Sequence, residues 1–285
     1  MNEVQGFLLE DCRLRGALVR LEETWRHVIA EHDYAPEVRR LLGEGVAATV
    51  LLASGLKARP SVSLQLQGDG PLKLLLIQCS RAFRVRGMAH ASGTAPQASP
   101  LLGAGRLVVN VDTGEKNGFF QGIVPLASER LDRCLEAYFD QSEQLPTRLV
   151  LRSTEAGVAG LLLQVLPGRD EELGTEEFAA AAAAAETVIS SELATLPAAE
   201  LLPKVFAGRL IRLFDANPVH HDCRCTPERL AGVLRMLGAE ELNSLLAEQG
   251  HVELNCEFCN KSFRYHERDV ETILQGGAVP SSLVH

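Results

Sequence analysis

The 285-residue chain has no uninterrupted run of 18 apolar residues, so no membrane-spanning helix is expected. Its first seven residues lack the basic start and long apolar stretch of a secretory signal, and we therefore expect a cytoplasmic protein. Basic residues are few: 28 Lys and Arg are outnumbered by 37 Asp and Glu, for a formal net charge of -9. Because phosphate contacts need clustered basic side chains, this composition argues against general nucleic-acid binding.

The chain also lacks the common catalytic motifs. It has no glycine-rich phosphate loop followed by lysine, and no nucleophile elbow. Gly43-Glu44-Gly45 lies within a helical pattern, where two glycines indicate close packing and not a phosphate site. Hydrophobic residues make up 46% of the chain, which is enough for a sizeable core. These motifs therefore give no indication of an enzyme, and none is expected.

Most of the chain shows strand patterns interrupted by turns. Ser61 to Gln67 alternates apolar and polar residues, the turn Gly68-Asp69-Gly70-Pro71 follows, and Leu72 to Cys79 is a second strand of the same hairpin. Helical spacing recurs in Tyr34 to Leu56, and residues 1 to about 57 are expected to form a short strand followed by helix. Further strands are expected at Phe83–Gly87, Arg106–Val111, Phe119–Val124, Leu149–Arg152 and Gly160–Leu166, with a helix at Ser128–Phe139 that Ser128 caps.

Clustered hairpins with helices outside them predict an α+β fold and not alternating βαβ units. We expect three parts: a large N-terminal domain of antiparallel strands with helices over residues 1–168, a helical linker over 169–216 and a small metal-binding domain over 217–285.

The linker has an unusual composition. Asp170 to Pro203 contains eight acidic residues and no Lys or Arg, and the run Ala179 to Ala185 has a strong helix preference but buries little apolar area. The segment is either a solvated connector helix or a metastable linker that docks weakly. Its larger apolar side chains, the candidate anchors to the strands of the core, are Phe178, Ile189, Leu193 and Leu196.

The tail is short and rich in loops. Two helices are expected at Pro227–Met236, capped by Thr226, and at Ala239–Gln249, followed by a hairpin of His251–Leu254 with Ser262–Tyr265. About 65 residues with few large apolar side chains form a thin core, and a structural metal would supply the missing stability.

Four of the seven cysteines supply a metal site. Cys223-Arg224-Cys225 and Cys256-Glu257-Phe258-Cys259 are two close pairs separated by a loop, the arrangement that a tetrahedral zinc ion requires. We expect one zinc ion per chain, bound by Cys223, Cys225, Cys256 and Cys259. Chance clustering of buried cysteines is the alternative interpretation. A second alternative replaces one sulfur with a nearby histidine, namely His220, His221, His251 or His266.

The first cysteine pair also suggests redox chemistry. A Cys-x-Cys motif holds two thiols close enough to join into a small, strained disulfide ring. Zinc-bound thiolates remain nucleophilic, so an oxidant that attacks them removes the metal ligands. Since the free energy of zinc binding is folding free energy in such small domains, loss of the metal is expected to unfold the tail.

The cysteine spacing resembles that of the redox-switch domain of the bacterial 33-kilodalton heat-shock chaperone family. Short motifs along most of the chain carry the same resemblance. They are Gly55-Leu56-Lys57, Gly68-Asp69-Gly70-Pro71-Leu72, Val85-Arg86-Gly87, Phe120-Gln121-Gly122-Ile123-Val124-Pro125-Leu126, Ser142-Glu143-Gln144-Leu145-Pro146-Thr147 and Gly160-Leu161-Leu162-Leu163-Gln164-Val165-Leu166-Pro167.

The resemblance implies a redox-regulated holdase, which binds unfolding client proteins without ATP. The reduced, zinc-bound form would be inactive. Oxidation would pair Cys223 with Cys225 and Cys256 with Cys259, release zinc, and unfold the switch and linker. The active form would be a homodimer that passes clients to ATP-driven foldase chaperones during the stress response.

Two other classes of protein remain possible on the cysteines alone. A zinc-ribbon nucleic-acid module is disfavoured because acids outnumber bases in the tail. A thiol–disulfide oxidoreductase would place its Cys-x-x-Cys at the start of a helix beside a strand, and this tail lacks that setting. The additional cysteines Cys12, Cys79 and Cys134 are expected to be buried core residues.

Overall fold

The computed structural model describes residues 1–56, 61–92, 101–116, 118–166 and 171–277, with the side chains of 171–175 left aside. The chain forms two compact units, which are described separately. The first comprises Met1–Ile29 and Asp33–Asp222, and the second comprises Ala30–His32 and the chain from Cys223 onward. Segment 169–216 thus belongs to the first unit. Among the described residues, no helix is long and apolar enough to cross a membrane.

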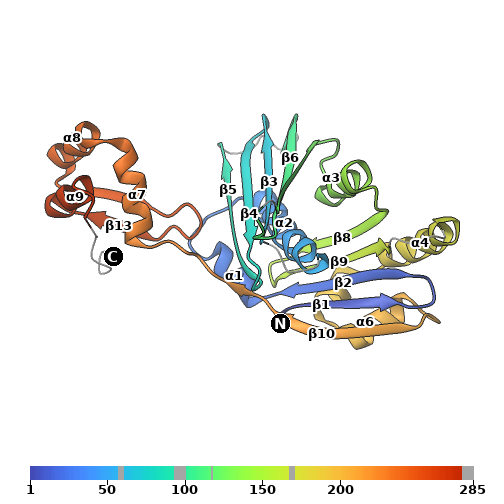
Figure 1. Ribbon diagram of the computed structural model, residues 1–285. Helices are drawn as coiled ribbons and strands as arrows, with labels where there is room; N and C mark the ends of the chain where they lie inside the picture. The colour runs from blue at the N-terminus through green and yellow to red at the C-terminus, as the bar shows by residue number, and fades with distance from the viewer. Residues whose placement is uncertain (57–60, 93–100, 117, 167–170, 278–285) are drawn as a thin grey trace. The chain divides into compact units, whose positions relative to one another are not determined.

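The first unit contains two sheets of mainly antiparallel strands (Figure 1). The five-stranded sheet has the order β10-β1-β2-β9-β8, and the six-stranded sheet has the order β11-β5-β4-β3-β6-β7. Among the described strands, β11 and β5 alone pair in parallel. The strands are β1 (Asn2–Leu9), β2 (Leu14–Leu21), β3 (Ser61–Gly68), β4 (Leu72–Cys79), β5 (Arg84–Ala91), β6 (Gly105–Asp112), β7 (Phe119–Pro125), β8 (Thr147–Ser153), β9 (Val158–Val165), β10 (Ile211–Pro218) and β11 (His220–His221).

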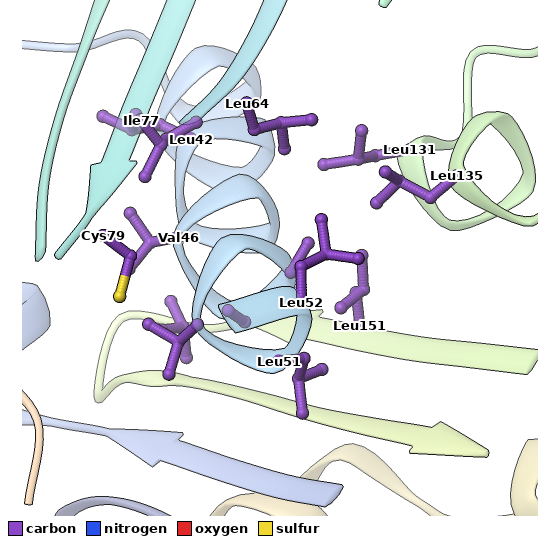
Figure 2. Close-up of a cluster of buried hydrophobic side chains, with 14 of the residues drawn as sticks. Leu42, Val46, Leu51, Leu52, Leu64, Ile77, Cys79, Leu131, Leu135 and Leu151 are labelled. Carbon is purple, nitrogen blue, oxygen red and sulfur yellow. The ribbon is translucent and has the colours of Figure 1, made fainter. Parts of the chain in front are cut away.

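Helix α2 (Pro36–Gly55) is the centre of the core and lies between the two sheets (Figure 1). Its side chains Leu42 and Val46 lie near Ile77 of β4, while Leu51 lies on the side of the other sheet (Figure 2). Gly43 and Gly45 permit this close approach. A Cβ on Gly43 would lie 2.7 Å from Val158 Cγ1, and one on Gly45 would lie 2.7 Å from Ile77 Cδ1. The packing role predicted for these glycines is confirmed.

Two short helices complete this layer, α1 (Glu23–Ile29) and α3 (Leu131–Tyr138), and α3 continues into one π-helical turn at Phe139–Glu143. The predicted cap of α3 is wrong by two residues. Arg130 is the N-cap, and Ser128 Oγ accepts a hydrogen bond of 3.1 Å from the Arg130 backbone N–H instead. The hydroxyl therefore stabilises the turn that precedes the helix.

Three of the described strands were missed by the sequence pattern: β2, β10 and the two-residue β11. The first segment contains β2 as well as β1. The pattern missed β2 because this strand is almost fully buried and its mostly apolar sequence shows no alternation. The end of the predicted helical linker is β10, which pairs with β1. None of the side chains of β10 is fully buried, so its sequence lacks the apolar pattern by which strands are recognised.

Gly16 in β2 provides a test of this packing. A Cβ at this position would collide with the Phe7 ring and lie 2.7 Å from the backbone oxygen of Leu162, so Gly16→Ala should lower the free energy of unfolding by about 1–3 kcal/mol. Gly55→Ala is the control, because the nearest neighbouring atom there is 3.9 Å away, and we expect a change below about 1 kcal/mol. Urea unfolding followed by fluorescence of Trp25, the single tryptophan, reports on this unit. Equal effects of both substitutions would contradict the assigned contact.

Candidate metal centre and linker

The structure brings the four predicted metal ligands together in the second unit. Their sulfur atoms all lie within 4.8 Å of one another. Two of the separations join the two motifs: Cys223 Sγ is 3.5 Å from Cys256 Sγ, and Cys225 Sγ is 3.4 Å from Cys259 Sγ. A tetrahedral ion with metal–sulfur bonds of about 2.3 Å would place its ligand sulfurs roughly 3.8 Å apart. The donor set and its spacing therefore fit a closed tetrahedral metal site.

Each cysteine pair is positioned by a local motif. Cys225 precedes α7 (Pro227–Leu237), where the predicted cap is confirmed: Thr226 Oγ1 accepts a hydrogen bond of 3.3 Å from the Arg229 backbone N–H. The second pair lies in the turn between β12 (Val252–Asn255) and β13 (Ser262–Tyr265).

That turn is closed by its backbone. The Cys256 N–H donates to Lys261 O at 2.9 Å, and the Asn260 N–H donates to Cys256 O at 2.7 Å. Asn260 has a φ of 52°, a left-handed conformation that asparagine tolerates better than most residues. The tight turn keeps both sulfurs of the pair on one side of the hairpin.

The second unit has a small apolar core, built from this hairpin, α7, α8 (Ala239–Gln249) and α9 (Glu267–Leu274). Tyr265 is fully buried, and its hydroxyl donates to Pro227 O at 3.0 Å. Cys223, Cys225 and Cys259 pack against the cluster from its edge. Its buried members are Ala231, Leu234, Leu242, Val252, Cys256, Phe263, Tyr265, Val270 and Ile273.

The pKa values of the Cys225, Cys256 and Cys259 thiols are shifted in different directions. Burial raises the pKa of Cys225, and the neighbouring thiols of Cys259 and Cys223 raise it further. Burial also raises the pKa of Cys259, to about 11. At Cys256 burial acts in the same direction, but hydrogen bonds from the backbone N–H groups of Cys259 and Phe258 outweigh it and lower the pKa. Four adjacent sulfurs cannot all ionise without a positive charge, and a metal cation supplies that charge.

Among the described residues, no histidine joins this group. His266 instead caps α9, in a reciprocal capping box with Asp269. His251 lies beside His266, with ring centroids 6.3 Å apart, and His220 and His221 belong to β11 of the first unit. The histidine alternative for the fourth ligand therefore has no support in this geometry.

The three additional cysteines lie in the first unit and are buried, as expected. Burial raises the pKa of all three thiols, that of Cys79 to about 12. The Cys134 thiol also donates to Ser128 O at 3.1 Å. These thiols are poor nucleophiles at neutral pH, since thiolates are the reactive species.

The linker forms three helices: α4 (Glu171–Glu186), α5 (Ser190–Thr195) and α6 (Ala198–Val205). The linker helices pack on the face of the five-stranded sheet opposite α2 (Figure 1). Leu193 is 0% exposed there, and the partly buried Phe178 and Leu196 pack against the same cluster. The buried residues of this linker interface are Phe7, Leu9, Cys12, Leu14, Leu18, Val150, Ala159, Leu161, Leu163, Ala181, Ala185, Val188, Leu193, Ala198, Leu201, Leu202 and Phe206.

The structure corrects the expectation for Ile189, whose side chain is 57% exposed. Helix α4 has ended, and Ile189 is the extended N-cap of α5, with ψ 148°. Adjacent side chains in extended chain point to opposite sides, and the buried neighbour is Val188. Ala181 and Ala185, one helical turn apart, are also buried, so part of the alanine run is a packing face and not a solvated one.

Arginines of the core pair with the acidic linker. Glu186 at the end of α4 lies 2.7 Å from Arg133 Nη2 and 3.1 Å from Arg148 Nη1. The buried Arg20 of β2 donates to the carbonyl oxygen of Leu196 and lies 2.7 Å from Glu3 of β1. The sequence pattern missed these contacts, although a stretch with eight acids and no Lys or Arg, Asp170 to Pro203, requires cations from outside that stretch.

Comparisons with known proteins agree with this architecture of an α+β unit followed by a small cysteine-rich unit. Residues 2–266 match the family model described as Hsp33 protein. The 33 kDa chaperonin of Enterobacter sp. is 36% identical over 100% of this chain and 99% of its own. That of Nitrosococcus oceani is 40% identical over 95% and 94%. The crystal structure of the 33 kDa chaperonin from Thermotoga maritima has the same fold, with a TM-score of 0.81 at 23% identity over 97% and 99% of the chains.

The chain therefore belongs to the class of molecular chaperones. It belongs to the Hsp33 family, a family of chaperones and not of enzymes.

Leu193 and Ile189 provide a matched test of the linker interface. Leu193→Ala removes a fully buried side chain and should cost about 2–5 kcal/mol, whereas Ile189→Ala should change stability by less than about 0.5 kcal/mol. Hydrogen exchange of the reduced protein would show faster exchange of the α5 and α6 amides in the Leu193 variant only. Unchanged protection in that variant would show that Leu193 does not anchor the linker.

Proposed function

We propose that this chain is a redox-regulated, ATP-independent holdase, inactive when reduced and zinc-bound and active after oxidation. The proposal is carried by one observation, the four cysteine sulfurs within 4.8 Å of one another on the thin core of the second unit. Residues 1–168 would be the chaperone core, 169–216 the linker and 217–285 the redox switch. Clients would be unfolding proteins in the cytoplasm.

Zinc is the metal that this donor set favours. Thiolates are soft ligands, and a tetrahedral site of four sulfurs is typical of structural zinc. When bound, the ion would tie the Cys-x-Cys segment to the β12–β13 turn and hold the sulfurs as thiolates. Structural zinc contributes about 10–16 kcal/mol in small finger domains, which is large compared with the stability that nine buried side chains supply alone.

Oxidation of the thiolates would remove every ligand of the ion. Each disulfide forms when two thiolates lose two electrons, and one peroxide molecule takes up these electrons with two protons from the solvent as it becomes two water molecules. Two peroxides therefore oxidise one site. Cys223 and Cys256, and likewise Cys225 and Cys259, have sulfurs in close contact although they belong to different motifs, but those contacts belong to the folded unit. Once the unit unfolds, ring closure within each motif has the smaller entropy cost, which favours Cys223–Cys225 and Cys256–Cys259.

Unfolding of the switch would then release the linker, which would uncover the apolar face of the five-stranded sheet. Leu14, Leu18, Leu161 and Leu163 on that face are at most 1% exposed beneath the linker. Such a surface binds exposed apolar segments of unfolding proteins without directional contacts. As the family resemblance implies, the active form would be a homodimer that passes its clients to ATP-driven foldases.

The metal assignment predicts different effects of neighbouring substitutions. Cys256→Ser should reduce the zinc content from about one ion per chain to a small fraction, because it removes one of four ligands. Cys134→Ser, which changes a buried thiol elsewhere, should keep the zinc, as should His266→Asn, which preserves the helix cap. Elemental analysis of the purified reduced proteins measures this. Full zinc loading of the Cys256 variant would refute the site.

Peroxide treatment tests the redox function itself. We expect zinc release, disulfides within each motif and suppression of light scattering by an aggregating client, all absent from the reduced protein. Peptide mapping under non-reducing conditions identifies the bridges, and the buried Cys12, Cys79 and Cys134 should remain reduced. Dominant Cys223–Cys256 linkage would overturn the pairing alone. Equal suppression by the reduced and oxidised proteins would overturn the redox regulation.

A further inference from the structure

Strand β10 lies at the edge of the five-stranded sheet, and its side chains are less buried than those of its neighbour β1. None of its eight side chains is fully buried, although Ile211 and Leu213 pack partly against the linker interface. By contrast, Val4, Phe7 and Leu9 of the adjacent β1 are at most 1% exposed. Figure 1 shows β10 along the margin of the sheet, beside β1. The strand is therefore held mainly through its backbone, and its side chains contribute little burial.

The hydrogen-bond pattern defines which backbone groups hold β10. The Val219 N–H donates to Asn2 O at 3.0 Å at one end, and the Glu10 N–H donates to Leu210 O at 2.9 Å at the other. Bonded pairs alternate along an antiparallel ladder, so Val4 and Leu8 of β1 face Asn217 and Arg212 of β10. The intervening residues of β1 bond to β2 instead, as the Glu22 N–H does to Met1 O at 3.0 Å.

The position of β10 in the chain connects it to the switch. It begins shortly after α6 of the linker, and only residues 219–222 separate its end from Cys223. We propose that β10 leaves when the switch and linker unfold, and that the exposed edge of β1 then binds an extended segment of a client by β-strand addition. This inference rests on the proposed function and assigns it a second client-binding element, distinct from the apolar face.

The chemistry of this edge suits a chaperone with many clients. Main-chain hydrogen bonds recognise any extended segment regardless of its side chains. Some preference remains, because Ile211 and Leu213 show where apolar side chains at alternate positions would pack. Acidic groups flank the edge: Glu10 pairs with Arg212, and Asp11 lies 3.1 Å from Arg209. The favoured client segment is therefore extended, apolar at alternate positions and basic near its start.

A peptide with the sequence of residues 209–219 tests this inference through backbone methylation. One version carries N-methyl groups at Arg212 and Asn217, whose N–H groups face β1, and the other at Leu213 and Ala216, whose N–H groups face away. The two methylated peptides have the same amino-acid sequence and the same number of added methyl groups. Peroxide-treated protein should bind the second version like the unmodified peptide and the first at least about tenfold more weakly, since two hydrogen bonds are lost. The reduced protein should bind none of them.

Two further measurements separate this inference from the redox function. Arg212→Pro removes a β10 donor to β1, so the reduced variant should bind peptide with the same methylation preference, without oxidation. Bound peptide should also slow hydrogen exchange at Val4 and Leu8, but not at Gln5 and Phe7, which bond to β2.

Equal binding of the two methylated peptides, both to the peroxide-treated protein and to the reduced Arg212→Pro variant, would overturn strand addition, whatever the aggregation assay shows. If the preference persists in Arg212→Pro but peroxide-treated protein neither binds peptide nor suppresses aggregation, the edge is a binding site and the redox function is wrong.

Discussion

The structure depends on a sheet that must be covered on both faces. Strands β2 and β9 are buried along nearly their whole length, because α2 covers one face of the five-stranded sheet and the linker helices cover the other. Helix α2 lies between two sheets and has buried side chains on all sides, so it cannot leave without loss of the core. The linker covers only the outer face. It is therefore the one cover that can be withdrawn while the main core remains intact.

The chemistry of the linker makes its docking favourable but limited. Burial of apolar surface contributes roughly 25 cal/mol per Å². Because an alanine side chain has little apolar area, the burial of Ala181 and Ala185 contributes little free energy to docking. Burial also lowers the pKa of Arg20, which donates to the linker carbonyl of Leu196, although Glu3 opposes this effect. The ion pairs of Glu186 with Arg133 and Arg148 are partly exposed to water and therefore contribute little to the free energy of docking. The larger buried side chains of the linker, Val188, Leu193, Leu201, Leu202 and Phe206, therefore contribute more to docking than the alanines do.

Local signals predicted much of the architecture and the whole metal cluster. Cysteine spacing specifies a metal site because two short turns can each orient two sulfurs, and the hairpins of the six-stranded sheet follow from alternation and turn residues. Long-range partners were not predictable in this way. Strand β10 carries no apolar pattern, because its pairing uses the backbone. Val188 is buried and Ile189 is exposed, and which of the two is buried depends on where α4 ends. The arginine contacts required knowledge of which core side chains face the linker.

A single connection leads from the outer face of the sheet to the first metal ligand. The linker helices cover that face, β10 follows them and covers the edge of β1, and Cys223 comes a few residues later. In the proposed mechanism, a metal bound to Cys223 would restrain one end of this connection and so reduce the entropy that the docked segment loses. Release of that end costs the linker no direct contact with the sheet. It would lower the stability of docking all the same, because a segment with a free end loses more conformational entropy when it docks.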